Sequence, residues 1–500
     1  SYVIKKTFKT IAFQQFICYI ANTGVFCGLH CLLCTIIIFC ESTTLNGFSA
    51  AQEIRLSNIP ADRLDRNAPE NPVRRFLLIM LTIPNNAAAL PADLKYSNRF
   101  SVLSQFRSNE QLTANNIADS LNLSRQTVMK NIQFFLKHGL LVSVGKAPST
   151  NIGGKRPELF SLTDKLFLLC IELWPEELCL VLMDFQSNMI DKLCVRQPLL
   201  QQATGALDAV GKLATKFLQQ NNVPLSLLRG VCISTPGIVD YRTSMLKFNA
   251  LAPQWGNNIP IVDILRAYFG PDVMIVVENV GKLTARALLH DTALLKGQNL
   301  NDKRLLTVFT SWGLSGCLID RGRIHNGKHA LIGEFGHMTL EGSYPFRCGC
   351  GSSGCFEQVV GNTHIQMRIS QECSKYPDSM LQTIPVSAIT VETIFDMSER
   401  GDELARKIDA ELAQHFAVAL RNISLNFDQE CVVIQGIFSN ADDYFKQQLN
   451  EKLMEFHYYF DNTPFEIQYD TRPIYKLDQM GAYAYMLDSY LSNSELYAGA

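Results

Sequence analysis

Residues 333–357 read GEFGHMTLEGSYPFRCGCGSSGCFE, and this stretch decides the fold of the chain. It brings one imidazole and three thiols close together: His337, Cys348, Cys350 and Cys355. One histidine and three cysteines are a common ligand set of tetrahedral zinc, and four protein ligands leave no position for a metal-bound water. Glycines between the cysteines allow tight turns around an ion. The stretch therefore predicts a structural Zn²⁺ ion; the alternative is three unrelated buried cysteines beside a core histidine.

The charge of the chain is unevenly distributed. The 500 residues carry a net charge of −2, but segment 97–160 contains eight Lys or Arg and three acids. That segment is therefore +5 and the remainder is −7. A basic module on an acidic body predicts a polyanionic partner for this segment alone, and the length allows about three domains.

The cysteines indicate the redox compartment. Three of the 15 belong to the predicted zinc site, and the others are scattered through apolar runs such as 168–170. This pattern favours buried free thiols in a reducing environment over a disulfide framework. We therefore expect a cytoplasmic protein.

Residues 1–95 are expected to be an extension outside the functional fold. Segment 16–40 is apolar and long enough to span a bilayer. Three lysines precede it, as in a signal anchor. A membrane anchor is the alternative, although it conflicts with a reduced zinc site.

Residues 96–162 have the pattern of a winged helix-turn-helix domain. Thr113 is placed to begin a short helix, and Ser124 to begin a second helix that ends at Gly139. Two strands, at 140–144 and 158–162, then enclose a basic loop that forms the wing. The second helix of such a domain enters the DNA major groove.

Six polar side chains of this domain are candidates for DNA contacts: Arg125, Gln126, Thr127, Lys130, Lys155 and Arg156. Arginine suits the acceptors of guanine, glutamine suits adenine, and lysine suits phosphate. The last two residues lie in the wing, where cations suit the minor groove or the phosphate backbone. Helix-turn-helix modules also bind proteins, but the combination of charge, caps and basic wing favours DNA.

From residue 163 onward, strand-like segments alternate with helix-like ones. The strand-like segments are 166–173, 178–185, 230–234, 273–277, 305–310 and 431–434. This pattern predicts an α/β body in two lobes with a ligand cleft between them.

Several blocks of the body closely resemble the ROK family (repressor, open reading frame, kinase). They are GVCISTPGIVD at 230–240, Asn249 and Trp255, VEN at 277–279, and the zinc stretch quoted above. GGKRP at 153–157 resembles the transcription-factor branch typified by the N-acetylglucosamine repressor and Mlc. The resemblance covers about residues 98 to 490. It implies a winged helix-turn-helix followed by a two-lobed actin-like (RNase H-like) ATPase-fold body with structural zinc. The implied lobes are 163–295 and 296–490, with a C-terminal helix that returns to the first lobe.

Five residues match the sugar-contacting positions of that family: Asn249, Asn279, Glu334, His337 and Glu357. Converging amides and carboxylates hold hydroxyls by directional hydrogen bonds. His337 could bind zinc through one nitrogen and offer the other to a sugar. For the asparagines the alternative role is turn chemistry, and for the glutamates it is support of the zinc ligands.

Four departures from the family's kinases argue against phosphoryl transfer. ELWPEE at 172–177 replaces the first phosphate loop, while TSWGLSG at 310–316 and QGI at 435–437 alter the later glycine-rich motifs. Val280 stands where the kinases have the aspartate that acts as general base, and valine cannot accept a proton.

We therefore expect a sugar-responsive repressor of carbohydrate-metabolism genes that is not an enzyme and binds no ATP. It would bind operator DNA as a homodimer or homotetramer, with a sugar or sugar phosphate as effector. An ATP-dependent sugar kinase of the same family is the main alternative, and a membrane-anchored sensor is the third.

Overall fold

The computed structural model describes residues 91–108, 111–148, 156–174, 177–196, 203–295, 303–456 and 465–493. The apolar segment 16–40, nearly all of the predicted extension and the wing tip with Lys155 lie outside these residues. Among the helices that are described, none has the length and apolar character needed to cross a membrane.

The first module contains three helices and a small sheet. Its helices are α4 (Pro91–Ser104), continued by the 3₁₀ turn η2 (Gln105–Ser108), α5 (Ala114–Leu121) and α6 (Arg125–Lys137). Its strands β1 (Leu112–Thr113), β3 (Glu158–Leu162) and β2 (Leu141–Lys146) pair in that order, antiparallel.

Capping residues mark the ends of the helices in this module. The Thr113 hydroxyl accepts from the backbone N–H of Asn116 at the start of α5, and the Ser124 hydroxyl accepts from that of Thr127 at the start of α6. These are the two predicted N-caps. Gly139, at φ 68°, follows the end of α6 in the left-handed conformation that was predicted.

Two cations of the basic segment are used in packing. Arg99 is buried, with its guanidinium 3.5 Å from the centroid of the Phe134 ring. Arg107 forms an ion pair of 2.8 Å with Asp488. The basic surface of the segment is therefore smaller than its net charge suggests.

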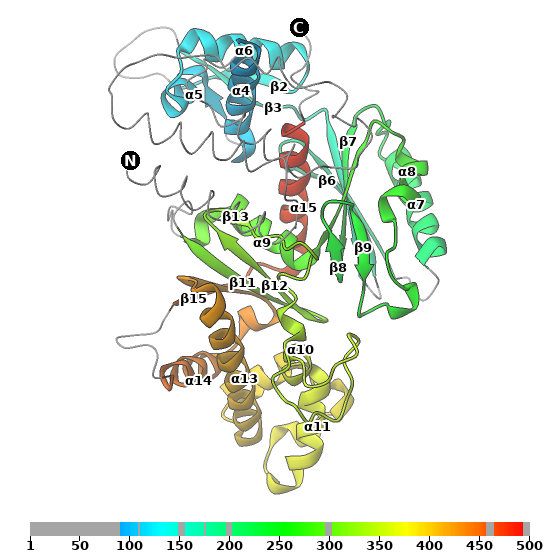
Figure 1. The fold of residues 1–500 in the computed structure, drawn as a ribbon, viewed down its shortest axis with the longest axis vertical. Coiled ribbons are helices and arrows are strands. Elements are labelled where there is room, and N and C mark those ends of the chain that lie inside the picture. Colours follow the sequence, from blue (N-terminus) through cyan, green and yellow to red (C-terminus); the bar gives the residue numbers. More distant parts are fainter. Residues whose placement is uncertain are drawn as a thin grey trace, which may run out of the picture. The chain divides into compact units, whose positions relative to one another are not determined.

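The first sheet of the body has the order β10-β7-β4-β5-β6. Its strands are β4 (Phe167–Leu173), β5 (Leu178–Asp184), β6 (Met189–Val195), β7 (Leu228–Thr235) and β10 (Met274–Asn279). Helices α7 (Ala203–Gln220) and α8 (Ile261–Phe269) cover one face (Figure 1), and α15 (Ile474–Leu491) packs on β4 and β7 from the other. The hairpin β8 (Ile238–Asp240) and β9 (Met245–Phe248) lies beyond the end of β7.

The second sheet has the order β13-β12-β11-β14-β15. Its strands are β11 (Arg304–Thr310), β12 (Leu314–Asp320), β13 (Arg323–Ile324), β14 (Cys431–Gly436) and β15 (Glu466–Asp470). One face packs against a helical layer of α10 (Phe356–Val359), α11 (Asn362–Glu372), α12 (Val391–Glu399), α13 (Glu403–Phe427) and α14 (Asp443–Met454). Helix α9 (Val280–His290) covers the other face.

Both sheets share one topology. In each, three antiparallel strands in sequence order are followed by two strands that add in parallel beside the first. No internal repeat is visible in the sequence, because the two copies share strand order rather than residues. The α/β body of mixed sheets thus agrees with the prediction of an α/β fold.

Helices α9 and α15 pack closely together. A methyl group at Gly481 of α15 would lie 1.9 Å from the Leu283 carbonyl oxygen of α9, so only glycine permits this approach. Toward its C-terminal end, α15 contributes Leu487 and Tyr490 to the apolar cluster that also contains Phe106 of the first module. One helix therefore contacts both the body and the first module.

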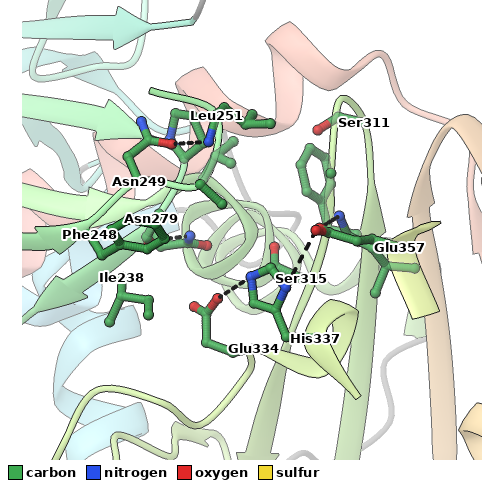
Figure 2. Close-up of a pocket in the computed structure, with 17 residues that line it drawn as sticks. Ile238, Phe248, Asn249, Leu251, Asn279, Ser311, Ser315, Glu334, His337 and Glu357 are labelled. Atoms are coloured by element: carbon green, nitrogen blue, oxygen red, sulfur yellow. Dashed lines mark hydrogen bonds and ion pairs between the residues drawn. The ribbon is translucent and has the colours of Figure 1, made fainter. Parts of the chain in front are cut away.

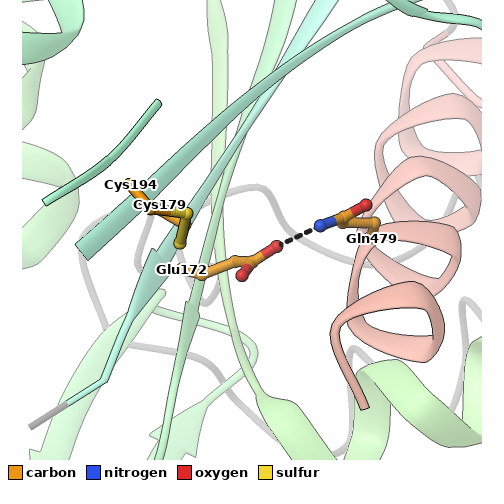
Figure 3. Close-up of a disulfide and its surroundings, with 4 residues drawn as sticks. All are labelled: Glu172, Cys179, Cys194 and Gln479. Carbon is orange, nitrogen blue, oxygen red and sulfur yellow. Dashed lines mark hydrogen bonds between the residues drawn. A yellow bond between two sulfur atoms is a disulfide. The ribbon is translucent and has the colours of Figure 1, made fainter. Parts of the chain in front are cut away.

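The structure corrects one expectation about the cysteines. Cys179 and Cys194 form a disulfide between β5 and β6 (Figure 3), whereas the sequence favoured free thiols throughout. The two residues are directly opposite in the antiparallel register, which brings their side chains together. Strand β6 was not predicted, so this pairing could not be anticipated.

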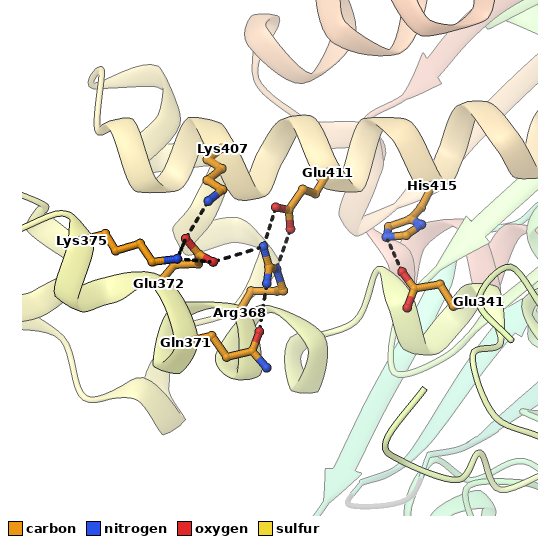
Figure 4. A network of polar contacts seen from close by, with 8 residues as sticks. All are labelled: Glu341, Arg368, Gln371, Glu372, Lys375, Lys407, Glu411 and His415. Atoms are coloured by element: carbon orange, nitrogen blue, oxygen red, sulfur yellow. Dashed lines mark hydrogen bonds and ion pairs between the residues drawn. The ribbon is translucent and has the colours of Figure 1, made fainter. Parts of the chain in front are cut away.

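A polar network joins α11 to α13 (Figure 4). Arg368 donates two 2.8 Å hydrogen bonds to Glu411, while Glu372 pairs with Lys375 and Lys407. The two lysines lower the pKa of Glu372 to about 2. This network fixes the helical layer next to the zinc stretch.

Candidate functional site

All five predicted sugar-contacting residues line one cavity of about 60 Å³ (Figure 2). Asn249 follows β9, Asn279 ends β10, and Glu357 lies on α10. Glu334 and His337 flank and end the short 3₁₀ helix η6 (Phe335–His337). Residues more than 100 positions apart in sequence are thus brought to one place.

The two asparagines serve partly in turn chemistry, the alternative considered from sequence. The Asn279 amide is used at both ends: its oxygen accepts from the Gly281 N–H at 2.8 Å, and its nitrogen donates to the Gly237 carbonyl at 2.8 Å. It therefore caps α9 and holds the β8 loop. The Asn249 oxygen accepts from the Leu251 N–H, and its nitrogen donates to no other described residue.

Val280 lies beside Asn279 in the lining of the cavity. It is the first residue of α9 and is 4 % exposed. Its isopropyl group offers an apolar surface and no proton acceptor at this point of the wall.

The acidic groups of the cavity gather around His337. Its Nε2 lies 3.9 Å from Glu334 Oε2, and its Nδ1 lies 3.4 Å from Glu357 Oε1. Burial raises the pKa of the Glu334 carboxyl, while His337 acts in the opposite direction. Glu357 also accepts from the Cys348 thiol at 3.0 Å and from the Leu314 N–H at 3.5 Å.

The four predicted zinc ligands form a compact cluster. Their ligand atoms all lie within 4.8 Å of one another. The Sγ atoms of Cys350 and Cys355 are 3.7 Å apart, and Cys348 Sγ is 3.6 Å from His337 Nδ1. A tetrahedral site with Zn–S of about 2.3 Å and Zn–N of about 2.0 Å separates two sulfurs by about 3.8 Å and sulfur from nitrogen by about 3.5 Å. The donor set therefore fits zinc, with His337 Nδ1 as ligand.

A tight backbone contact shapes the zinc stretch. Gly354 has φ 66°, and a methyl group there would lie 1.8 Å from the Glu341 carbonyl oxygen. Only glycine fits this position, as the sequence suggested for the glycines between the cysteines. Cys355 immediately follows and is fully buried.

Sequence reasoning missed two serines of the cavity, Ser311 and Ser315. Both flank the turn between β11 and β12. Ligands of α/β proteins commonly bind beyond the carboxyl ends of strands, so the position of Ser311 just after β11 was the available signal.

The candidate DNA-contacting residues lie on the first module. Arg125, Gln126 and Lys130 are exposed on α6. Thr127 is half-buried, and its hydroxyl bonds to that of Ser124. It therefore supports the helix cap.

A groove of about 520 Å³ runs between α6 and the β2–β3 hairpin. Three cations line it: Arg125, Lys146 and Arg156. The groove joins Arg125, which was predicted to read bases, with Arg156, which was predicted to contact the minor groove or the phosphate backbone.

In each of two loops of the body, one backbone N–H group bonds within its own loop. The Trp174 N–H donates to the Glu177 carbonyl at 3.0 Å, and the Ser311 N–H donates to the Gly313 carbonyl at 2.9 Å. Phosphate-binding loops instead leave successive N–H groups free to point at the ligand.

Comparison with known proteins identifies the family. The ROK family model matches residues 168–475. The N-acetylglucosamine repressor of Escherichia coli O6:H1 is 24 % identical over 331 residues, covering 65 % of this chain and 77 % of the repressor. A glucokinase of Thermotoga maritima is 25 % identical over 254 residues, covering 50 % of this chain and 77 % of the enzyme.

Solved structures agree with the fold. A ROK family transcriptional regulator described as a homolog of the E. coli Mlc protein superposes with a TM-score of 0.66 at 17 % identity. The superposition covers 81 % of this chain and 100 % of that regulator. The family match spans more than half of the sequence, and the chain belongs to the ROK family.

Proposed function

We propose that this protein is a sugar-responsive transcriptional regulator, acting as a repressor of carbohydrate-metabolism genes. The first module, residues 96–162, is a winged helix-turn-helix domain that binds operator DNA. The two lobes, 163–295 and 296–490, bind a sugar or sugar phosphate in the cleft. The similarity to the N-acetylglucosamine repressor supports this role.

The observation that carries the proposal is the position of Val280. A sugar kinase needs a group that takes the proton of the attacking hydroxyl. Val280 lies in the cavity wall directly after Asn279, where an apolar side chain cannot do this. Occupancy of the cleft is then a signal, and the sugar leaves unchanged.

The sugar would be held by polar groups that come from both lobes. Asn249 can donate to a hydroxyl and Glu334 can accept from one, while His337 Nε2 faces the cavity when Nδ1 binds zinc. The zinc ion, held by His337, Cys348, Cys350 and Cys355, fixes the orientation of that imidazole.

The small cavity suggests how binding becomes a signal. A volume of about 60 Å³ is well below the roughly 300 Å³ of small ligand pockets. We expect the lobes to separate when a sugar enters, so that the bound state differs from the one described here. A ligand that prefers one lobe arrangement shifts the population toward it.

Helices α9 and α15 offer the path from the cleft to the DNA-binding module. Asn279 caps α9, and α9 packs on α15 through Gly481. Arg107 of the first module then pairs with Asp488 of α15. A shift of α9 on sugar binding would move the winged helix and change the spacing between the two recognition helices of a homodimer or homotetramer.

An ATP-dependent sugar kinase is the second candidate. The Glu334 carboxylate in the cavity and the similarity to a glucokinase favour it. It requires a nucleotide site, however, and the N–H groups of Trp174 and Ser311 are bonded within their own loops. Sugar-dependent release of ADP would support the kinase.

Selection of bound fragments from random duplex DNA, followed by fluorescence anisotropy, tests the regulator. We expect one enriched duplex, weaker binding in the presence of an effector sugar, and loss of binding in Arg125→Ala. Lys137→Ala is the matched control, since Lys137 is an exposed cation at the other end of α6. Enrichment of no duplex at any sugar concentration would exclude the proposal.

A further inference from the structure

A second cavity adjoins the predicted sugar site. It has a volume of about 730 Å³, and Ser311 lines both cavities. Residues of both lobes contribute to it, among them Glu172 and Tyr475 from the side of the first sheet and Trp312 and Asn362 from the side of the second. A molecule longer than one sugar ring could therefore extend from the first cavity into the second.

Three aromatic side chains, Trp174, Trp312 and Tyr475, line this second cavity. Trp312 is 61 % exposed and Tyr475 is 55 % exposed, and Trp174 is half-buried beside them. Two of the three tryptophans of the whole chain therefore line one cavity. Large exposed rings in a concave site indicate a ligand with apolar surface. The C–H faces of a pyranose ring offer such a surface, while its edge remains polar.

Polar groups suited to hydroxyls surround the rings. Asn362 uses its side-chain oxygen to accept from the Val391 N–H at 3.0 Å, which leaves its amide nitrogen as a donor. Glu177 and Glu392 are exposed carboxylates that accept from hydroxyl groups. Donors and acceptors beside exposed aromatic rings suit the hydroxyl groups and the C–H faces of a sugar.

Phosphate chemistry fits this cavity poorly. Its charged lining has three carboxylates, on Glu172, Glu177 and Glu392, against the two cations Lys192 and Arg196. The backbone N–H groups of Trp174 and Ser311 are bonded within their own loops. A neutral polyhydroxyl ligand meets neither obstacle.

We propose that the second cavity binds the next sugar unit of a glycoside whose first unit occupies the cavity of Asn249 and Glu334, so that the effector is a disaccharide or longer oligosaccharide. The proposal rests on the sugar-binding role proposed above. Trp312 and Tyr475 stack on the second unit, and Asn362 hydrogen-bonds to its hydroxyls. The glycosidic bond passes Ser311, and no bond of the ligand is broken.

Isothermal titration of the full chain with paired ligands tests this inference. The pairs are glucose with cellobiose and maltose, N-acetylglucosamine with chitobiose, and xylose with xylobiose; ADP is titrated separately. We expect one disaccharide to bind at least about tenfold more tightly than its own monosaccharide. The same disaccharide should change the tryptophan fluorescence, because Trp174 and Trp312 line the second cavity.

Variants separate the two cavities. Trp312→Ala should lower disaccharide affinity about tenfold and leave monosaccharide affinity within about twofold. Trp312→Phe, which keeps an aromatic ring, should retain most of the affinity advantage of the disaccharide over the monosaccharide. Leu425→Ala is the control, since Leu425 is 60 % exposed on α13 and lines neither cavity.

Three results would overturn the inference. If a monosaccharide releases DNA and no disaccharide binds more tightly, the regulator stands and the second subsite fails. If ADP binds and displaces the disaccharide, the cavity is a nucleotide site. If no carbohydrate binds, the proposed function and this inference fail together.

Discussion

Arg107 Nε lies 2.8 Å from Asp488 Oδ1, and this ion pair joins the first module to α15. The same helix contacts α9, whose N-cap is a residue of the predicted sugar site. Since both side chains are more than a third exposed, the pair adds little stability. We infer that its role is to fix the angle between α15 and the first module.

Replacement of this ion pair should weaken the coupling between effector binding and DNA binding without unfolding the protein. In Asp488→Asn we expect the effector-induced change in DNA affinity to shrink by about threefold, because the winged helix is less firmly held to α15. Anisotropy titrations of DNA with and without effector measure this change in DNA affinity. Asp396→Asn is the control, as Asp396 forms a similarly exposed pair with Arg400 on α12. An unchanged effector response in Asp488→Asn would exclude this path.

Gly481→Ala should force α9 and α15 apart. The added methyl group would meet the Leu283 carbonyl, so we expect a loss of about 1–3 kcal/mol in the free energy of unfolding. Urea denaturation measures this loss. Gly342→Ala is the matched control, because nothing lies within 4 Å of a methyl group there. Equal stability of the two variants would contradict the close helix contact.

Cys355→Ser should remove the zinc ion and, with it, sugar binding. Cys355 is fully buried in the predicted ligand cluster, and the loss of one ligand frees His337 to rotate. We expect zinc content to fall from one ion per chain toward zero and effector affinity to fall at least about tenfold. Elemental analysis and calorimetry give the two values. Cys373→Ser, a half-exposed thiol outside the cluster, is the control; full zinc content in Cys355→Ser would refute the assigned ligand set.

Asp409 should make stability depend on pH. Burial raises the pKa of its carboxyl to about 8. The native state therefore keeps a proton that the unfolded chain loses at about pH 4. The native state binds more protons between these values, and stability therefore falls as pH rises across this window. Asp409→Asn should flatten that fall, as measured by urea denaturation at about pH 5 and about pH 8. Asp443→Asn, which changes a fully exposed carboxylate, should show the same fall in stability as the unmodified protein. If stability still falls as steeply with pH in Asp409→Asn, Asp409 is not the source of the pH dependence.

Features that depend on residues close together in the sequence could be predicted from it. The caps at Thr113 and Ser124 and the ligand cluster around Cys348 depend on residue type and local spacing, and the structure contains them. The strands of the body were found where both faces are buried, as in β4 and β14, because a continuous apolar run predicts them.

Features that depend on contacts between residues far apart in the sequence could not be predicted from it. Strand β6 is half-exposed, so its pattern is weak and the pairing of Cys179 with Cys194 was missed. The burial of Arg99 against Phe134 depends on helix packing. Tyr475 reaches the second cavity only because α15 returns to the first sheet, more than 280 residues after β5.

The central claim is that cleft occupancy is read as a signal and is not a step in turnover. One reaction tests it directly: full-length protein, labelled operator DNA, effector sugar and Mg-ATP, with anisotropy and ADP followed together. The account predicts release of the DNA by sugar alone, an affinity change of about tenfold that ATP does not alter, and no ADP above background. Sugar-dependent ADP formation, or DNA release that requires ATP, would contradict it.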